Sequence, residues 1–260
     1  MPVNLKSASP LTAPRSPSKP PRPPLTLLGN ESLRAAREFI SLKLAGAPPD
    51  RTGDSHPAVI FPGLATDGRA VAPLRKHYLA LGYTAMDWGP RFNAGPQGDV
   101  DSRLARLADD ISGKVARYNQ PTTLIGWSLG SIYARELAKL IPAEQLRQVI
   151  TIGTPFNTAA GRNNVAWLFR LLSRRPAVVD AALGRRLVTP PPLPTTSICS
   201  KSDGVVAWQS CRHKRPAPQA QDIEVVSSHI GMGWNPAVLS VIADRLAQKP
   251  DDWCRYRLKE

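Results

Sequence analysis

The sequence has few cysteines and no long apolar run, and each shortage excludes a class of protein. Three cysteines in 260 residues, Cys199, Cys211 and Cys254, are too few for a disulfide-built scaffold. No stretch approaches the roughly 20 consecutive apolar residues that a membrane-spanning helix needs. The N-terminus also lacks the apolar core of a secretory signal peptide. We therefore expect a soluble, cytoplasmic protein in a reducing compartment, with association to a membrane surface as an open alternative.

Acidic residues are also scarce. The chain has 34 Lys and Arg against 20 Asp and Glu, which gives a formal net charge of +14. Such a charge favours contact with anionic surfaces, whether nucleic acid, phospholipid or cell envelope. Because the sequence contains no nucleic-acid-binding motif and no zinc-ligand spacing, we expect neither a nucleic-acid partner nor a metal. Two interpretations remain: a basic enzyme surface, or peripheral contact with an anionic membrane. The oligomeric state stays open.

The ends of the chain differ in character from its middle. Residues 1–24 are rich in proline and basic residues and predict a disordered tail. Residues 25–56 predict an amphipathic helix and a linker. Asn30 or Ser32 can cap this helix, and an apolar face recurs at helical spacing, formed by Leu33, Ala36, Ile40 and Leu44. We expect this face to pack on the domain, with a membrane surface as the alternative. Residues 57–250 form the predicted domain, and residues 251–260 a C-terminal tail.

Short apolar runs and helical patterns alternate through this domain. The predicted strands cover residues 58–61, 83–86, 122–125, 149–152, 196–199 and 223–226. Helices are expected between them: one ends at Gly82, one is capped by Asp101, one covers residues 131–140, and one closes the domain around Val238 and Leu246. This alternation predicts an α/β fold with a mostly parallel sheet and helices on both faces. Residues 157–192 interrupt it and predict a small helical cap above the carboxyl ends of the strands.

The pentapeptide 126–130, Gly-Trp-Ser-Leu-Gly, is the most informative motif. It follows the predicted strand 122–125 and opens the next helix, which is the strand–turn–helix context of a nucleophile elbow. Such a turn exposes the serine at a helix N-terminus, where free N–H groups favour negative charge. Ser128 is therefore the predicted nucleophile.

A serine hydroxyl needs a base to take its proton. In this kind of fold the chain order is nucleophile, acid, histidine, so His56 and His77 come too early. His229 lies after the last predicted strand and is the predicted base. His213 stands among Arg212, Lys214 and Arg215, and we interpret it as solvated surface.

The acid should follow the strand before the last one. Asp203 lies there and would hold the imidazole in the right tautomer. A plain turn before Gly204 is the competing interpretation of Asp203. Asp180, in the predicted cap, and Asp222, at the start of a strand, are the alternatives.

The reaction also needs donors for an oxyanion. The N–H of Leu129 is one, because it follows the nucleophile. The loop after the first strand should supply the other, from Leu64 or, failing that, Ala65.

These pieces together resemble the lipase and esterase branch of the α/β-hydrolases. The resemblance covers about residues 57–247. It rests on Phe61-Pro62-Gly63, the serine pentapeptide, Gly153-Thr154-Pro155, Ser202-Asp203-Gly204 and Ser228-His229. It is closest to bacterial relatives of triacylglycerol lipases and to lipase-like deacylases of lipid-anchored proteins. Pro62 stands where many lipases carry histidine, which weakens the case for long-chain lipase activity.

The resemblance implies hydrolysis of a small-molecule or lipid carboxylic ester by a Ser-His-Asp triad without a cofactor. Trp127, Thr154, Pro155 and Trp167 are the predicted substrate-binding residues. An acyltransferase or thioesterase using the same triad is one alternative. A non-catalytic protein that binds through its basic surface is the other. A Cys199–Cys211 disulfide could stiffen the acid loop, but we expect free thiols.

Overall fold

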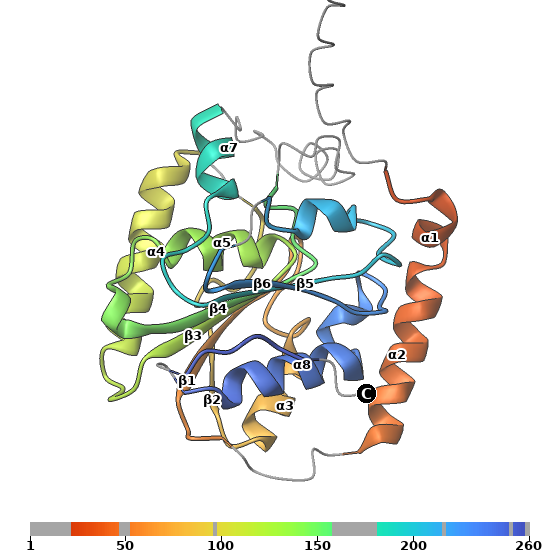
Figure 1. Ribbon diagram of the computed structural model, residues 1–260, viewed down its shortest axis with the longest axis horizontal. Coiled ribbons are helices and arrows are strands. Elements are labelled where there is room, and N and C mark those ends of the chain that lie inside the picture. Colours follow the sequence, from red (N-terminus) through yellow and green to blue (C-terminus); the bar gives the residue numbers. More distant parts are fainter. Residues whose placement is uncertain are drawn as a thin grey trace, which may run out of the picture.

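The computed structural model describes residues 22–46, 53–95, 98–157, 181–214, 217–249 and 252–257. These ranges contain six strands, with helices before, between and after them (Figure 1). The strands are β1 (Pro57–Phe61), β2 (Thr84–Asp87), β3 (Thr122–Trp127), β4 (Leu146–Ile152), β5 (Thr195–Cys199) and β6 (Ala220–Glu224). The α-helices are α1 (Leu25–Gly29), α2 (Glu31–Ala45), α3 (Ala72–Ala80), α4 (Val100–Val115), α5 (Leu129–Leu137), α7 (Ala181–Val188) and α8 (Pro236–Ala247). Short 3-10 turns are η1 (Ala143–Gln145), η3 (Trp208–Cys211) and η4 (Gly231–Gly233).

The six strands form one sheet in the order β2-β1-β3-β4-β5-β6, and every neighbouring pair is parallel. All six predicted strands are confirmed, with shifts at their ends. β4 and β6 both begin three residues before the predicted start, at Leu146 and Ala220, and β6 also ends two residues before the predicted end. The polar side chains of Gln221 and Asp222 are tolerated there because β6 lies at the sheet edge and is only partly buried. The prediction of a parallel α/β sheet is therefore correct.

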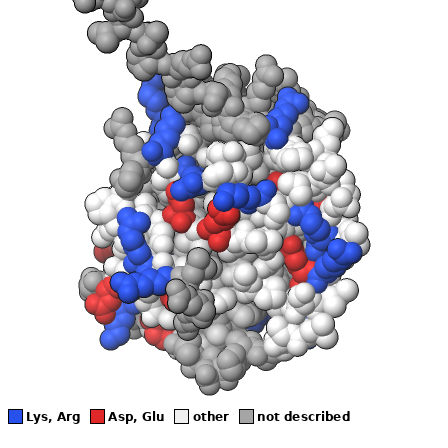
Figure 2. All heavy atoms as spheres, turned by 45° about the vertical axis from the view of Figure 1, so that its right-hand side comes forward, with Lys and Arg blue, Asp and Glu red and all other residues white. Residues whose placement is uncertain are grey.

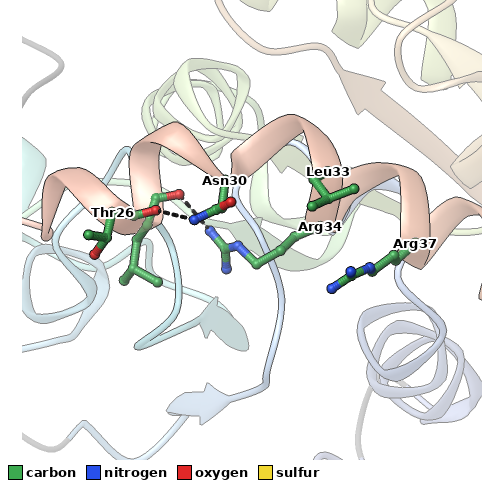
Figure 3. A pocket seen from close by; sticks show the side chains of 6 residues that line it. Thr26, Asn30, Leu33, Arg34 and Arg37 are labelled. Carbon is green, nitrogen blue, oxygen red and sulfur yellow. Dashed lines mark hydrogen bonds between the residues drawn. The ribbon is translucent and has the colours of Figure 1, made fainter.

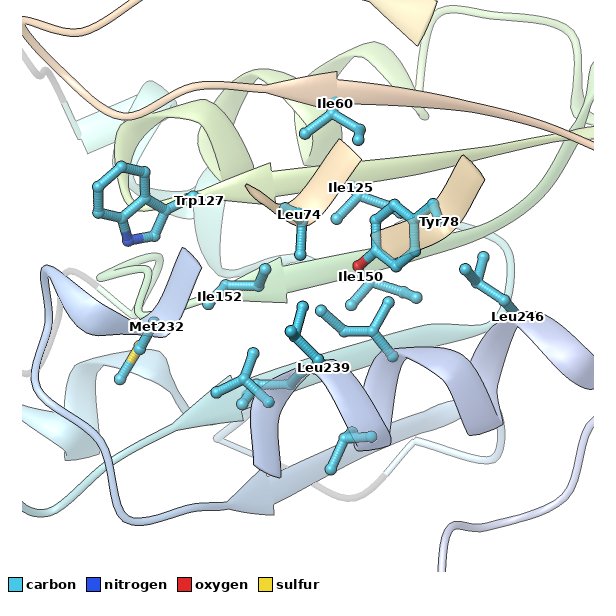
Figure 4. Close-up of a cluster of buried hydrophobic side chains, with 14 of the residues drawn as sticks. Ile60, Leu74, Tyr78, Ile125, Trp127, Ile150, Ile152, Met232, Leu239 and Leu246 are labelled. Atoms are coloured by element: carbon cyan, nitrogen blue, oxygen red, sulfur yellow. The ribbon is translucent and has the colours of Figure 1, made fainter. Parts of the chain in front are cut away.

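Alternate residues of the central strands contribute side chains to two separate hydrophobic cores, one on each face of the sheet. Ile60, Ile125 and Ile150 point to the face covered by α3 and α8, where Leu74 and Leu239 meet them (Figure 4). Their neighbours along the strands point to the opposite face, against α4 and α5. Since side chains alternate between faces with a period of two, a strand buried on both sides must be apolar throughout. This explains the short continuous apolar runs in the sequence.

Helices α4 and α8 confirm the predicted apolar faces, although one predicted cap is wrong. Leu104, Leu107, Ile111 and Val115 are buried along α4, and Val238, Val241, Ile242 and Leu246 along α8. The cap of α4 is Asp99, whose carboxylate accepts a hydrogen bond from the backbone N–H of Ser102 at 2.9 Å. Asp101 lies inside the first turn and pairs with Arg186 at 2.8 Å. The helix thus begins before the residue that was predicted to cap it.

Helix α2 exists as predicted, but the opposite face is buried. Leu33, Ile40 and Leu44 are 53%, 57% and 83% exposed. Glu31 and Ala35 are buried instead, with α2 lying against η4 and α8. The prediction that the apolar face packs on the domain is therefore wrong. The physical reason is that the carboxylates of Glu31 and Glu38 accept hydrogen bonds from backbone N–H groups in loops far along the chain.

Several predictions fall on residues outside the described ranges. These include nearly all of the 1–24 tail, Asp180 and Trp167 of the predicted cap, and the last residues of the C-terminal tail. Of the predicted cap, residues 157 and 181–192 are described. They include α7, which lies beside α4 and α5 (Figure 1). Within the described ranges, no helix combines the length and hydropathy that crossing a bilayer requires.

Candidate active site

Ser128 lies at a sharp turn between the end of β3 and the start of α5. Its backbone has φ 53° and ψ −121°, a left-handed conformation that is strained for a residue with a side chain. The turn needs glycine on both sides. A Cβ on Gly126 would lie 2.2 Å from the Cα of Ser131, and one on Gly130 would lie 2.2 Å from the carbonyl oxygen of Phe61. The spacing of the motif is thus explained by close backbone packing around the serine.

Ser128, His229 and Asp203 are brought into contact, each from a loop that follows a parallel strand. The Nε2 atom of His229 lies 3.1 Å from Ser128 Oγ, and its Nδ1 atom lies 2.7 Å from Asp203 Oδ2. The three strands β3, β5 and β6 end at the same edge of the sheet, which is where sites form in open α/β sheets. The chain can therefore pass a proton from a hydroxyl to an imidazole that a carboxylate orients.

The carboxylate of Asp203 makes both of the contacts that the sequence left as competing interpretations. Its Oδ1 atom accepts the backbone N–H groups of Val205 and Val206, each at 2.7 Å, which is a turn contact. Its Oδ2 atom remains for His229. With 3% exposure, Asp203 is held rigidly and kept from water. The turn and the imidazole contact are therefore compatible.

The environment of His229 favours its protonated form. Burial alone would lower the pKa of His229, but the charge of Asp203 and their hydrogen bond, with a smaller contribution from the charge of Glu31, raise it above 6.5. Gly153 lets this ring approach β4, since a Cβ there would lie 3.2 Å from His229 Nδ1. The indole N–H of Trp127 donates to the His229 carbonyl at 3.1 Å.

His213 and Asp222 form a separate pair away from Ser128. Their Nδ1 and Oδ1 atoms lie 2.6 Å apart, and the His213 side chain is 7% exposed. The prediction that His213 is solvated surface is therefore wrong, because an acid on the neighbouring strand and the ring of Phe156, 4.9 Å away, cover it. Asp222 is engaged here, because its carboxylate also accepts the backbone N–H of His213 at 3.1 Å.

The loop after β1 lies against Ser128, as the oxyanion prediction requires. A Cβ on Gly63 would come within 3.6 Å of the Ser128 Cβ. Within the described ranges, the Leu64 N–H has no acceptor in the protein, whereas the Ala65 N–H donates to the Asn93 carbonyl at 2.8 Å. The N–H of Ala65 is therefore already bonded, and the N–H of Leu64 remains the candidate donor to an oxyanion. Leu129 is the first residue of α5, where backbone N–H groups lack partners within the helix.

Asn93 and Ser131 support this arrangement, although neither was among the residues predicted from the sequence. The buried Asn93 amide donates to the Pro62 carbonyl at 2.8 Å and so braces the candidate oxyanion loop. The Ser131 hydroxyl donates to the Gly126 carbonyl at 2.5 Å and accepts from the Ile152 N–H. No local motif marks Asn93. Ser131 could have been noticed as a polar residue at an otherwise buried helix start.

The predicted substrate-binding residues have different surroundings. Thr154 is fully buried, and its hydroxyl donates to the carbonyls of Ser128 and Ile152, each at 3.1 Å. Trp127 is 6% exposed and belongs to the core. Both therefore support the turn and the histidine loop rather than offering surface to a ligand. Pro155 is partly exposed beside them.

The described residues contain no cluster of three or more His, Cys, Asp or Glu side chains arranged to hold a metal ion. Cys199 and Cys211 are buried free thiols, and Cys254 is an exposed one. Burial raises the pKa of Cys199 to about 12. Burial, together with the nearby charge of Asp203, also raises the pKa of the Cys211 thiol well above its usual value.

Neither a family model nor a curated protein sequence matches this chain. Solved structures do match. An esterase from Rhodococcus sp. ECU1013 superposes with a TM-score of 0.54 at 14% identity, over 75% of this chain and 92% of that one. A pyrethroid hydrolase from Sphingobium faniae JZ-2 gives a TM-score of 0.52 at 16% identity, over 74% and 97%.

Lipase B of Aspergillus fumigatus also has a TM-score of 0.52, at 15% identity, and covers 82% of this chain. This chain spans 59% of the length of that lipase. Identities this low establish shared architecture and nothing finer. The parallel sheet, its covering helices and these neighbours together show that the chain has the α/β-hydrolase fold.

Proposed function

We propose that the protein is a serine hydrolase that cleaves carboxylic esters through an acyl-enzyme. The observation that carries the proposal is the continuous contact from Ser128 Oγ through His229 to Asp203, at 3.1 Å and 2.7 Å. Both distances lie within the range at which a base takes a proton from a nucleophile. The strained Ser128 backbone supports the same conclusion, because strain of this kind persists where the surrounding structure holds a functional side chain in place.

In the acylation step, His229 Nε2 removes the hydroxyl proton as Ser128 Oγ bonds to the ester carbonyl carbon. The carbonyl electron pair moves onto oxygen, where the N–H groups of Leu64 and Leu129 donate to it. When the tetrahedral species collapses, the carbon–alkoxide bond breaks and His229 returns its proton to the leaving alcohol. Asp203 stabilises the imidazolium throughout and does not itself take the proton.

Deacylation repeats these steps with water as the nucleophile. His229 takes a proton from water, the hydroxide adds to the acyl carbon, and the Ser128 oxygen leaves with the returned proton. The net reaction is ester plus water giving acid plus alcohol. A single oxyanion donor typically contributes about 10²–10³-fold to such a reaction.

An ester substrate is supported by the chemistry of the site and by the neighbours. A Ser-His-Asp arrangement with two backbone donors serves acyl transfer from an activated carbonyl. The superposed structures are described as an esterase, a lipase and a pyrethroid hydrolase. We place the substrate in the class of carboxylic esters of small molecules or lipids.

The test is a chain-length series of nitrophenyl esters, assayed with the wild-type chain and with Ser128→Ala. We expect wild-type cleavage and a loss of at least 10³-fold in the variant, since removing the nucleophile removes the acyl-enzyme route. Ser102→Ala, at an exposed serine of α4 away from the turn, is the matched control and should cleave as the wild type does. A wild-type protein that cleaves none of the esters contradicts the proposal. Adding a competing alcohol or thiol would reveal acyl transfer, because the nitrophenol yield would then exceed the acid yield.

A further inference from the structure

Helix α2 lies outside the parallel sheet, yet one of its carboxylates joins the two loops that carry Asp203 and His229. Glu31 is 2% exposed. Its Oε1 atom accepts the N–H of Gly204 at 2.8 Å, and its Oε2 atom accepts the N–H of Ile230 at 3.1 Å. Gly204 directly follows Asp203, and Ile230 directly follows His229. A single side chain therefore bridges the residue after the acid and the residue after the base.

Arg34 holds the other side of Asp203. Its guanidinium pairs with Glu31 Oε1 at 2.6 Å and donates to the carbonyl of Ser202 at 2.5 Å. It also donates to the Leu27 carbonyl at 3.1 Å, which ties α1 into the same cluster. The residues before and after Asp203 are thus both bonded to α2.

Glu38 holds the other side of His229. Two helical turns after Glu31, its Oε1 atom accepts the N–H of Ser228 at 2.7 Å. Its Oε2 atom accepts the hydroxyls of Ser227 at 3.0 Å and Ser228 at 3.1 Å. The residues before and after His229 are therefore also bonded to α2. The approach is close, because a Cβ on Gly231 would lie 1.6 Å from Glu38 Oε2.

Packing alone does not account for this arrangement. Burying a carboxylate is costly unless its oxygens receive several hydrogen bonds, and apolar side chains would cover the same surface without that cost. Both acids instead direct their oxygens at backbone N–H groups next to the candidate catalytic pair. The two loops also meet directly, because the Ser200 hydroxyl donates to the Ser227 carbonyl at 2.8 Å and accepts the Ser227 N–H at 3.1 Å. Glu31 and Glu38 add bonds to the residues immediately beside Asp203 and His229.

We propose that Glu31 and Glu38 of α2 are positioning residues that fix the Asp203 and His229 loops relative to each other. The proposal rests on the proposed esterase function. The negative charge of Glu31 also raises the pKa of His229, together with Asp203. Glu31 therefore acts on both the geometry and the protonation of the base.

The test compares Glu31→Gln and Glu31→Asp in the full chain, using a nitrophenyl ester that the wild type cleaves. An amide can accept only one of the two N–H groups and carries no charge, so Glu31→Gln should lower kcat by tenfold or more with little change in KM. The acid-side midpoint of its kcat/KM profile should move to lower pH. Glu31→Asp keeps the charge but is too short for both bonds, so it should lower kcat while keeping the wild-type midpoint. Glu144→Gln, at an exposed glutamate, is the matched control.

A folded Glu31→Gln variant with wild-type kcat and midpoint overturns the proposal. If this variant does not fold, Glu38→Gln tests the same role, and a tenfold loss of kcat supports it whereas wild-type kcat overturns it. Thermal unfolding separates a positioning role from lost stability. Failure of the proposed function gives a different result, because the wild-type protein itself would then cleave no ester. Failure of the positioning role would leave wild-type cleavage intact and the Glu31 variants equal to it.

A different observation concerns the outer face of α1 and α2. Because both acids of residues 22–46 point inward, this face carries exposed apolar and basic side chains and no exposed acid. The exposed apolar side chains are Leu25, Leu33, Phe39, Ile40 and Leu44, and the exposed basic ones are Arg22, Arg37 and Lys43. Figure 2 brings this side forward and shows Lys and Arg side chains, with some Asp and Glu side chains next to them, set in a largely uncharged surface.

Spacing places four of these residues on one stripe of α2. Leu33, Arg37, Ile40 and Leu44 recur every three or four residues along α2. Leu33 and Arg37 also line a shallow pocket beside α1, with Thr26, Asn30 and Arg34 (Figure 3). An apolar stripe flanked by cations and free of acids matches the interface of an anionic bilayer in both hydropathy and charge.

We infer that this outer face docks on the surface of an anionic membrane. The probe is sedimentation of the full chain with vesicles of phosphatidylcholine, with or without phosphatidylserine. We expect binding to the vesicles that contain phosphatidylserine, weakened by salt and reduced about tenfold or more in the double variant Ile40→Ser with Leu44→Ser. Leu140→Ser, at another half-exposed leucine, should bind as the wild type does.

Absent or equal binding to the two kinds of vesicle overturns this inference. A dimer in solution that the double variant dissociates overturns it as well, since the stripe would then be covered by a second copy. Neither outcome depends on ester cleavage, so this test is independent of the proposed function.

Discussion

Replacing Asp203 with asparagine should abolish ester cleavage while leaving the fold almost intact. The oxygen of the new amide can keep the N–H groups of Val205 and Val206, which Asp203 Oδ1 now accepts at 2.7 Å. Its NH₂ group would then occupy the position of Oδ2, which lies 2.7 Å from His229 Nδ1. A donor at that position requires Nδ1 to accept, so the ring proton moves to Nε2, which faces Ser128. The base would then present a proton where it needs a lone pair.

The expected loss in kcat is on the order of 10⁴-fold, which corresponds to about 5.5 kcal/mol of transition-state stabilisation. The cost to folding is far smaller, about 1.5–3 kcal/mol for one hydrogen bond to a charged group. Activity and urea unfolding measured on the same preparation separate the two effects. Asp222→Asn is the matched control, because Asp222 makes an equally short contact with His213, at 2.6 Å, away from Ser128. Activity of Asp203→Asn within tenfold of wild type, or an equal loss in Asp222→Asn, would refute the reasoning.

Three further predictions follow from the same structure. Because the pKa of His229 is raised above that of an ordinary histidine, kcat/KM should fall on the acid side with a midpoint higher than an unperturbed imidazole would give, and a pH–rate profile with a lower midpoint would contradict this. Gly130→Ala should cost about 1–3 kcal/mol in urea unfolding, because its Cβ would lie 2.2 Å from a backbone oxygen. Gly113→Ala, with nothing within 4 Å, should gain up to about 1 kcal/mol, and equal stability of the two variants would count against the turn geometry. Finally, iodoacetamide should alkylate the exposed Cys254 in the native protein but not the buried Cys199, whose pKa is raised to about 12; mass spectrometry showing native Cys199 alkylated would contradict its burial.

Much of the fold could be predicted because its signals are local. A strand buried on both faces must be apolar along its whole length, so β1, β3, β4 and β5 were recognisable as short apolar runs. Chain order then predicted which histidine and which aspartate would meet Ser128. The structure brings these residues into contact, and their catalytic roles remain predictions.

The failures share a physical cause, which is that contacts formed only in the folded chain decide the outcome. Helix α2 has an apolar stripe that predicts the buried face. The buried Glu31 and the half-buried Glu38 face the domain instead, because their carboxylates accept N–H groups 173 to 199 residues away. His213 stands among basic residues, but Asp222 of β6 pairs with it and the Phe156 ring, from the loop after β4, packs against it. Asn93 braces the Pro62 carbonyl from a loop without any motif.

The most direct test of the central claim is labelling of the wild-type chain with a fluorophosphonate probe, followed by mapping of the modified peptide. We predict one adduct per chain, on Ser128, formed faster as His229 loses its proton and absent in Ser128→Ala. The buried Ser131, three residues further on, should stay unmodified. No adduct on the folded wild-type protein, or an adduct at another residue, would contradict the assignment of Ser128 as the nucleophile.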